Sequence, residues 1–399
     1  MFNPDPKSAG EPRLRVLLIG ASGVFGSRLA RFVAQEPGIE LILAARNLAK
    51  LEALADELSK RPHCIVLDRA SLTAQDLTGY DLVIDAAGPF EADGMRVVES
   101  AIAAKTDYLD LADGRAFVRE FPRYDEVAKG AGVALITGAS SIPALSHAVI
   151  DQLTSGWQAI DTIKIGIFPG NRAPRGLSVI EAILSYVGKP VRVFREGGWR
   201  NVSGWGMLHR EHVPGLGRRW ASVCDTPEQD LLVARYAPRQ SAEFFAGLEL
   251  PLLHLGLAAL ALPVRWGWLT SLRPLARPLR WLAQLFEPFG TDEGGMSVRA
   301  SGLDANGRQV ERAWSLTAIG GRGPNIPVLA ALAMLRRYRS GKRPEPGARA
   351  CSGILTLDDF AADFARLEIT HGFSDQGVLQ APISSEPGTG AERAVMASA

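Results

Sequence analysis

The sequence predicts an α/β protein, with a doubly wound parallel sheet in its first part and an α+β second domain after it. Three observations support this. Short apolar runs alternate with amphipathic helical patterns over residues 14–150, as expected for strands buried on both faces. A glycine-rich turn follows the first run. From about residue 157 the pattern changes to apolar and polar residues in alternation, which is typical of a half-exposed sheet.

Residues 15–46, RVLLIGASGVFGSRLARFVAQEPGIELILAAR, predict a strand, a turn, a helix and a second strand. Gly20, Gly23 and Gly26 give the turn a GxxGxxG spacing. Missing side chains there permit a tight turn, a close approach of backbone to a pyrophosphate, and close packing of helix on strand. The free N–H groups at the helix start, over Val24 and Phe25, form an anion site. The context favours a Rossmann-type nucleotide-binding unit over ordinary turn glycines.

Arg46 ends the second strand, where a unit that binds NAD usually carries an acid for the ribose 2′-hydroxyl. Its guanidinium instead suits a 2′-phosphate, and Lys50 follows one helical turn later. NADP is therefore predicted as the cofactor. Ser22 could add a hydroxyl to the same phosphate. The alternatives are that Arg46 only begins a solvated helix and that Ser22 is a plain turn residue.

Two further strand ends carry predicted cofactor contacts. Asp68 closes the run HCIVLD and could accept a hydrogen bond from the adenine amino group, or serve only as a turn or capping acid. The fourth run, YDLVIDAA, leads into a Gly-Pro turn at the edge where open α/β sheets bind ligands. The predicted contacts there are Ala87, Gly88, Pro89 and Phe90, and a simple turn is the alternative.

Composition excludes several classes of protein. The chain has 399 residues, 47% hydrophobic and 22% charged, which is ordinary for a globular protein of two domains. Its formal charge of +1 argues against a general attraction to nucleic acid. Three scattered cysteines give neither a disulfide framework nor a zinc spacing, and fit a reducing cytoplasm. Residues 1–13 are polar and proline-rich, so we expect a flexible leader and not a secretion signal.

Together, several segments resemble the saccharopine dehydrogenase-like oxidoreductases. They are GASGVFG (20–26), AAR (44–46), AAGPF (86–90), TDYLDLAD (106–113), GVALITGASSIPALS (132–146), GGRGPNIPVLAALAML (320–335) and GILTLDDF (353–360). The resemblance implies an NADP-binding Rossmann domain over 14–150 and an inserted α+β domain over 151–320, which forms the other wall of a cleft and serves in substrate binding or dimerisation. It further implies a helical segment over 321–373 that returns to the first domain. The amino-acid-recognition pattern of the saccharopine enzymes is absent from the middle region, which leaves the substrate unidentified.

The second domain offers its own signals. Residues 161–168 alternate as a strand, and residues 296–319 predict a β-hairpin that turns at Asn306-Gly307. His209 and His212 are spaced as metal ligands sometimes are, but no further ligand stands at a usable spacing, so no metal is predicted. Residues 374–399 are rich in Ser, Pro, Gly and Ala and are expected to be disordered.

Residues 249–287 have an unusual composition. No acid lies between Glu249 and Glu287, while the segment holds four arginines, three tryptophans and many leucines. Its longest uncharged run, 250–264, is too short to span a bilayer, which takes about 20 residues. We expect an apolar surface edged with arginine that meets a membrane, a lipid-like substrate or a second subunit in a homodimer.

The first functional hypothesis is an NADP-dependent oxidoreductase that transfers a hydride to or from a small or lipid-like carbonyl, imine or enoyl group in an interdomain cleft. Candidate proton donors near the strand ends are Tyr108, Asp110 and His147, although Asp110 could only brace a loop and His147 could belong to the core. A Tyr-x-x-x-Lys pair is missing from the expected position. The alternative is a non-catalytic NADP-binding module that senses redox state or sits on a membrane, a cytoplasmic protein in either case.

Overall fold

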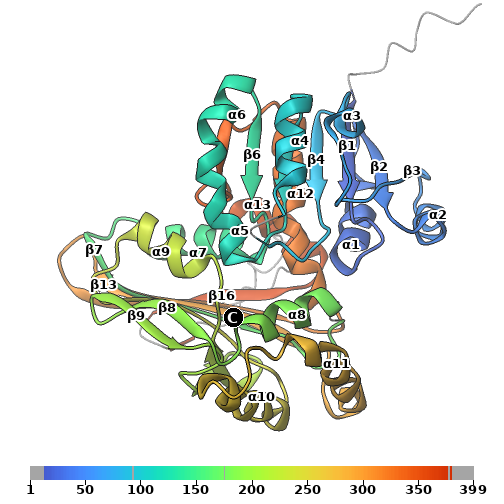
Figure 1. Cartoon of the computed structure of the whole chain (residues 1–399). Helices are drawn as coiled ribbons and strands as arrows, with labels where there is room; N and C mark the ends of the chain where they lie inside the picture. The colour runs from blue at the N-terminus through green and yellow to red at the C-terminus, as the bar shows by residue number, and fades with distance from the viewer. Residues whose placement is uncertain (1–12, 92–93, 175, 376–377, 380–399) are drawn as a thin grey trace, which may run out of the picture.

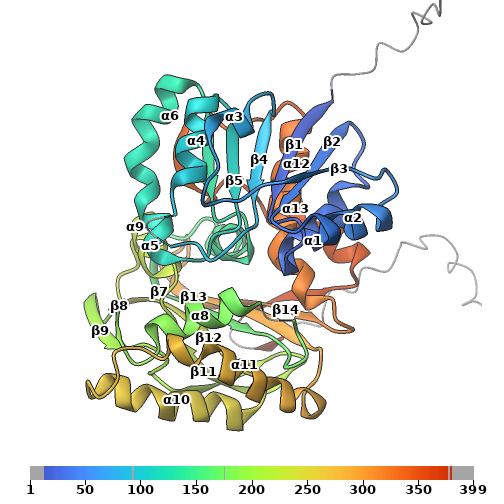
Figure 2. The ribbon, with the colours of Figure 1, turned by 45° about the vertical axis from the view of Figure 1, so that its right-hand side comes forward.

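The computed structural model describes residues 13–91, 94–174, 176–375 and 378–379. Each of its two domains is built on one β-sheet, and Figures 1 and 2 show the first domain above the second. The leader predicted for residues 1–13 lies outside the described residues except for Arg13. Most of the tail predicted for 374–399 also lies outside them.

The first domain contains a parallel sheet with helices on both faces, which confirms the predicted fold class. Its seven strands run in the order β15 (Gly347–Ala350), β6 (Ala134–Thr137), β5 (Asp107–Asp110), β4 (Leu82–Asp85), β1 (Leu14–Ile19), β2 (Ile39–Ala45) and β3 (His63–Val66). Because β1 lies between β2 and β4, the direction of winding reverses there. Ligands of open α/β sheets bind beyond the strand ends at such a reversal.

Alternate side chains of β1 lie on opposite faces of this sheet. Val16 and Leu18 join the core on one side, and Leu17 and Ile19 join the core on the other. The first face is covered by α1 (Val24–Val33), α2 (Leu48–Glu57) and α12 (Ile326–Arg339), with α13 (Asp358–Arg366) packed on α12. The second face is covered by α3 (Ala74–Leu77), α4 (Arg96–Ala104), α5 (Arg115–Glu120), η1 (Phe121–Tyr124) and α6 (Asp125–Ala131).

The second domain is a mixed sheet of ten strands. Its main path runs β10 (His209–Val213), β11 (Gly217–Val223), β12 (Ser241–Ala246), β7 (Ala159–Phe168), β13 (Gly294–Leu303), β14 (Gln309–Ala318), β16 (Thr370–Asp375) and β17 (Val378–Leu379). Strand β8 (Pro190–Arg195) pairs with β12 and with β9 (Gly198–Ser203). The antiparallel pairing of β13 with β14 confirms the predicted hairpin.

The helices of the second domain surround this sheet. They are α8 (Leu177–Tyr186), α9 (Glu228–Tyr236), α10 (Pro251–Arg265), η3 (Arg273–Leu275), α11 (Ala276–Leu285) and η4 (Glu287–Phe289). The irregular turn η2 (Ser141–Leu145) and helix α7 (Ser146–Leu153) lead from the first domain onto β13 and β14. One apolar core continues from the first sheet through α7 to the second, so the two domains share part of their interior.

The segment predicted to be helical over 321–373 is more varied than expected. It begins with η5 (Gly323–Asn325), and α12 packs on α1 of the first domain. The same segment also supplies strands, because β15 pairs with β6 in the first sheet and β16 pairs with β14 in the second. Residues 374–375 and 378–379, placed in the predicted tail, belong to strands β16 and β17. The boundaries of the domains stay a prediction. Among the described residues, no helix is both long and apolar enough to cross a bilayer.

Candidate active site

The glycine-rich turn forms a tight cradle where the winding of the first sheet reverses. Gly20 has φ of +76°, and a Cβ there would lie 2.8 Å from the side chain of Ala87 at the end of β4. A Cβ on Gly26 would overlap the carbonyl oxygen of Gly20. Both positions therefore exclude side chains, as a close approach of helix, strand and bound pyrophosphate requires.

The start of α1 is open to an anion. Gly23 is its N-cap residue, no side chain caps the helix, and its first turn holds no acid. The N–H groups of Val24, Phe25 and Gly26 have no partner within the helix, because the first N–H groups of any helix lack one. Ser22, half-buried, stands next to this turn. The cradle and the free N–H groups fit a dinucleotide pyrophosphate without any basic side chain.

Arg46 and Lys50 lie beside the neighbouring strand end. Arg46 directly follows β2, is exposed, and has no acidic partner among the residues that the structure describes. Lys50 lies in the first turn of α2, where its N–H donates to the side chain of Asn47 at 3.0 Å. Both side chains are free to meet a 2′-phosphate. Their contact with the cofactor stays a prediction.

Asp68 accepts a hydrogen bond from the N–H of Ala70 at 3.1 Å and so stabilises its own turn, the alternative considered for it. The adenine contact stays a prediction. The next residue has a role that the sequence analysis missed. Arg69 Nε donates to the buried carboxylate of Asp85 at 2.8 Å, and its guanidinium lies over the ring of Phe90 at 5.3 Å.

This ion pair positions the turn after β4. Arg69 also donates to the carbonyl oxygen of Gly94 at 3.2 Å, so it links both ends of the segment that contains Gly88, Pro89 and Phe90. Burial raises the pKa of Asp85, and the nearby guanidinium of Arg69 opposes that shift. The signal in the sequence was an acid within the apolar run LVID, since a buried acid needs a partner.

Two of the candidate proton donors, Tyr108 and Asp110, are fully buried at the end of β5. Asp110 Oδ1 accepts hydrogen bonds from the N–H of Gly138 at 2.7 Å, the N–H of Ala112 at 2.9 Å and the hydroxyl of Thr137 at 2.9 Å. Burial raises the pKa of Asp110 to about 7. The carboxyl group therefore joins the loops after β5 and β6, and its catalytic role stays a prediction.

His147, the third candidate, is enclosed at the contact between the domains. Its Nε2 lies 3.0 Å from Glu228 Oε2, and its Nδ1 lies 2.6 Å from Ser352 Oγ. The carbonyl oxygen of His147 accepts a hydrogen bond from the hydroxyl of Tyr236 at 3.2 Å. Because both ring nitrogens are engaged and the side chain is fully buried, the geometry favours a positioning role for His147. Its assignment as a proton donor is not tested by these contacts.

Groups from both domains also meet beyond the end of β5. Arg115 of α5 donates to both carboxylate oxygens of Asp230 at 2.6 and 2.7 Å and to Asp225 at 2.9 Å. Tyr186, at the end of α8, is half-buried. Burial raises the pKa of its phenol well above the usual value, with further contributions from Cys224, Asp225 and Asp113. Asp113 follows β5, so this cluster joins the two domains.

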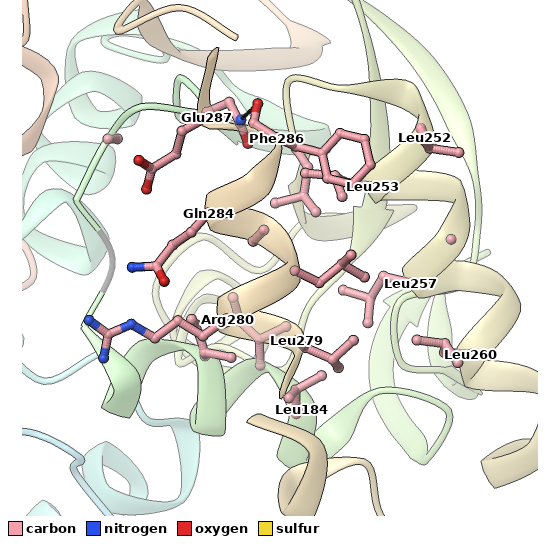
Figure 3. Close-up of a pocket in the computed structure, with 18 of the residues that line it drawn as sticks. Leu184, Leu252, Leu253, Leu257, Leu260, Leu279, Arg280, Gln284, Phe286 and Glu287 are labelled. Carbon is pink, nitrogen blue, oxygen red and sulfur yellow. Dashed lines mark hydrogen bonds between the residues drawn. The ribbon is translucent and has the colours of Figure 1, made fainter. Parts of the chain in front are cut away.

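A large apolar cavity opens next to the glycine-rich turn. Its volume is about 730 Å³, and it lies among α8, α10 and α11. Figure 3 shows leucines of α10 turned toward α11, while the polar ends of Arg280, Gln284 and Glu287 point together to the opposite side. One of its lining residues is Val24, the first residue of α1. The cavity therefore extends from the second domain to the predicted pyrophosphate site.

Comparison with known proteins agrees with the nucleotide-binding fold of the first domain. Residues 16–136 match the family model described as the saccharopine dehydrogenase NADP binding domain. A saccharopine dehydrogenase (L-Glu forming) from Saccharomyces cerevisiae has a similar fold, with a TM-score of 0.63 and 16% sequence identity over 90% of this chain and 99% of that one. A trans-acting enoyl reductase from Mycobacterium ulcerans (strain Agy99) is 28% identical over 145 residues. That match spans 34% of this chain and only 35% of the relative's length.

The Rossmann sheet, its glycine cradle and the matched segment define a dinucleotide-binding domain of the oxidoreductase type. More narrowly, residues 16–136 match the NADP-binding domain of saccharopine dehydrogenases, and the cofactor is NADP.

Proposed function

We propose that the protein is an NADPH-dependent reductase that acts on a double bond of an apolar, acyl-like substrate. One observation carries the proposal: the apolar cavity of the second domain reaches Val24 in the glycine-rich turn. An apolar chain in that cavity would lie beside the cofactor. Ligand sites commonly combine such apolar walls with a few polar groups.

An enoyl group is the acceptor that we favour, because the similarity to a trans-acting enoyl reductase adds to the shape of the cavity. When bound, NADPH supplies a hydride, so that the β-carbon of the enoyl group gains the hydride, the α-carbon gains a proton and the carbon–carbon double bond becomes single. NADP⁺ is the other product.

The chain itself must orient the acyl group and provide the proton. Leucines of α10 and isoleucines of α8 would hold the chain and exclude water, and the polar ends of Arg280 and Gln284 would hold its carbonyl end. For the proton we favour Tyr186, which stays protonated, is half-buried, and shares α8 with the cavity-lining Ile183. A Tyr186→Phe change should lower kcat and leave NADPH affinity intact.

The test is NADPH oxidation with a panel of trans-2-enoyl thioesters, alkyl aldehydes and cyclic imines. With NADPH deuterated on the transferred position, the enoyl product should gain one deuterium at the β-carbon, detected by mass spectrometry. If NADPH binds but none of these acceptors oxidises it, the reductase proposal fails and the non-catalytic NADP-binding module is favoured.

A further inference from the structure

We propose that the surface built by α10, η3, α11 and η4, here called the α10–α11 face, docks on an anionic lipid bilayer. Within this face, α10 lies at the end of the molecule away from the first domain (Figure 2). Of the seventeen large apolar side chains that are exposed in the described chain, eleven belong to residues 252–289. About a tenth of the chain thus carries most of the exposed large apolar side chains of the described residues, and patches of that kind mark interaction sites.

The exposed side chains on this face are mainly aromatic and leucine. Trp268 and Phe289 are each 74% exposed, Trp281 is 63% exposed and Trp266 is 58% exposed. Tryptophan concentrates at membrane interfaces because its ring is apolar while its N–H can stay in contact with water and headgroups. The composition of the face therefore matches the boundary between a bilayer and water.

The charge of the face is entirely positive between Glu249 and Glu287. Arg265 and Arg277 are exposed and have no acidic partner in the part of the chain that the structure describes, whereas Arg273 pairs with Glu91 at 2.7 Å. Unpaired arginines beside exposed tryptophans are complementary to acidic headgroups. A second copy of the chain would bring like charges together around a two-fold axis, which makes a subunit interface the weaker explanation.

The cavity opens on the same face. Leu252 and Leu282 line the cavity and are 67% and 41% exposed. Helix α10 has only 15 residues, so the face would lie on the bilayer without spanning it. A docked protein could then take an acyl chain directly from the lipid phase. This last step rests on the proposed function, but docking itself does not.

Docking is tested by flotation of the full chain with vesicles of phosphatidylcholine alone, or of phosphatidylcholine and phosphatidylglycerol at about two to one. We expect binding to the mixed vesicles that weakens at high salt and is at least about tenfold weaker with phosphatidylcholine alone. Arg265→Glu with Arg277→Glu should reduce binding to the mixed vesicles by about the same factor. Trp266→Ser with Trp268→Ser should also reduce it.

The controls are single changes of the same kind on other surfaces. Lys342→Glu alters an exposed cation, and Trp199→Ser alters an exposed tryptophan; both should bind the mixed vesicles as the original protein does. NADPH affinity, measured on every variant, reports folding and is independent of lipid. Absence of flotation with both vesicle types would overturn the docking proposal, as would variants of the face that bind like the controls. The docking proposal would also be overturned if the protein forms a dimer at high salt and the tryptophan changes dissociate that dimer, because the face would then be a subunit interface. If the protein reduces its substrate but does not bind vesicles, the docking proposal is contradicted and the proposed function is not.

Discussion

The glycine-rich turn and the apolar cavity meet at Val24, yet the chain builds them in different ways. The turn lies within seven consecutive residues and works through its backbone, since side chains are excluded at Gly20 and Gly26. The cavity is made of side chains from segments spread between Val24 and Glu287. The first kind of site leaves a short motif in the sequence, whereas the second depends on the fold.

The largest effect is expected from Gly26→Ala, which tests whether the turn depends on backbone contact. The new Cβ would overlap the carbonyl oxygen of Gly20 and lie 2.9 Å from Cα of Ala21. Because both are backbone atoms, the turn itself would have to shift to make room. NADPH affinity should fall by about a hundredfold or more, which corresponds to about 2.7 kcal/mol. Titration by the fluorescence of bound NADPH measures it.

The matched control is Gly130→Ala in α6, where an added Cβ meets nothing within 4 Å. That change should leave NADPH affinity unaltered and raise the free energy of unfolding by about 0.5–1 kcal/mol, because alanine restricts the unfolded chain more than glycine does. Equal NADPH affinities in the two variants would contradict the proposed cradle.

Leu257→Gln tests the other side of the comparison. Leu257 lines the cavity, and an amide in its place would lose apolar contact with a bound chain. We expect kcat/KM for a long-chain enoyl thioester to fall roughly tenfold or more, with NADPH affinity unchanged. Leu262→Gln is the control, because Leu262 lies on the same helix but does not line the cavity. If both variants keep full activity, the cavity does not hold the substrate.

Asp110 predicts a dependence of stability on pH. The pKa of its carboxyl rises from 3.8 to about 7 on burial, so between these values the folded state holds a proton that the unfolded state has released. The free energy of unfolding should therefore fall as pH rises through this window, by at most about 1.4 kcal/mol per pH unit from this group. Asp110→Asn should flatten that slope.

Urea unfolding at several pH values between about 4 and 8 measures the effect of Asp110. The amide oxygen that Asp110→Asn introduces can still accept the bonds from Gly138 and Thr137, so the fold should persist. Asp56→Asn on the exposed surface of α2 is the control and should keep the original slope. A slope that the Asp110 change leaves unaltered would show that this carboxyl is ionised throughout the range.

The smallest effect is expected from Arg46→Asp. An aspartate there would repel a 2′-phosphate, so NADPH affinity should fall by about tenfold, or about 1.4 kcal/mol, while NADH affinity stays the same or rises. The NADH measurement serves as the internal control. An unchanged preference for NADPH would contradict the assignment of Arg46 as a contact of the 2′-phosphate.

Local patterns predicted much of the fold. The strands β1, β2 and β4, the glycine-rich turn and the β13–β14 hairpin each follow from consecutive residues, because strand, turn and helix preferences act over short distances. Arg46 and Gly88 were predicted to contact the cofactor because they follow the ends of two of those strands. The strand β15 was missed because it is short and joins the edge of a sheet formed far earlier in the chain. The strand β16 was missed because α12 and α13 separate it in the sequence from its partner β14.

Long-range contacts account for what the sequence could not predict. The partners of His147 within the fold, Glu228 and Ser352, lie 81 and 205 residues away in the sequence. The ion pair of Arg115 with Asp230 joins residues 115 positions apart. Nothing in the neighbouring sequence indicates such pairs. In contrast, the composition of residues 249–287 predicted an apolar surface edged with arginine, and many large apolar side chains there are exposed.

Gly256 allows the most direct test of the central claim that the apolar cavity holds the hydride acceptor. It lines the cavity within α10, and an added Cβ meets nothing within 4 Å. Gly256→Phe should fill the cavity, while Gly256→Ala should only favour the helix. For enoyl thioesters of increasing length, we predict that Gly256→Phe lowers kcat/KM at least about tenfold for long chains and little for short ones. Gly256→Ala should match the original protein. The same chain-length profile in all three proteins would contradict the account.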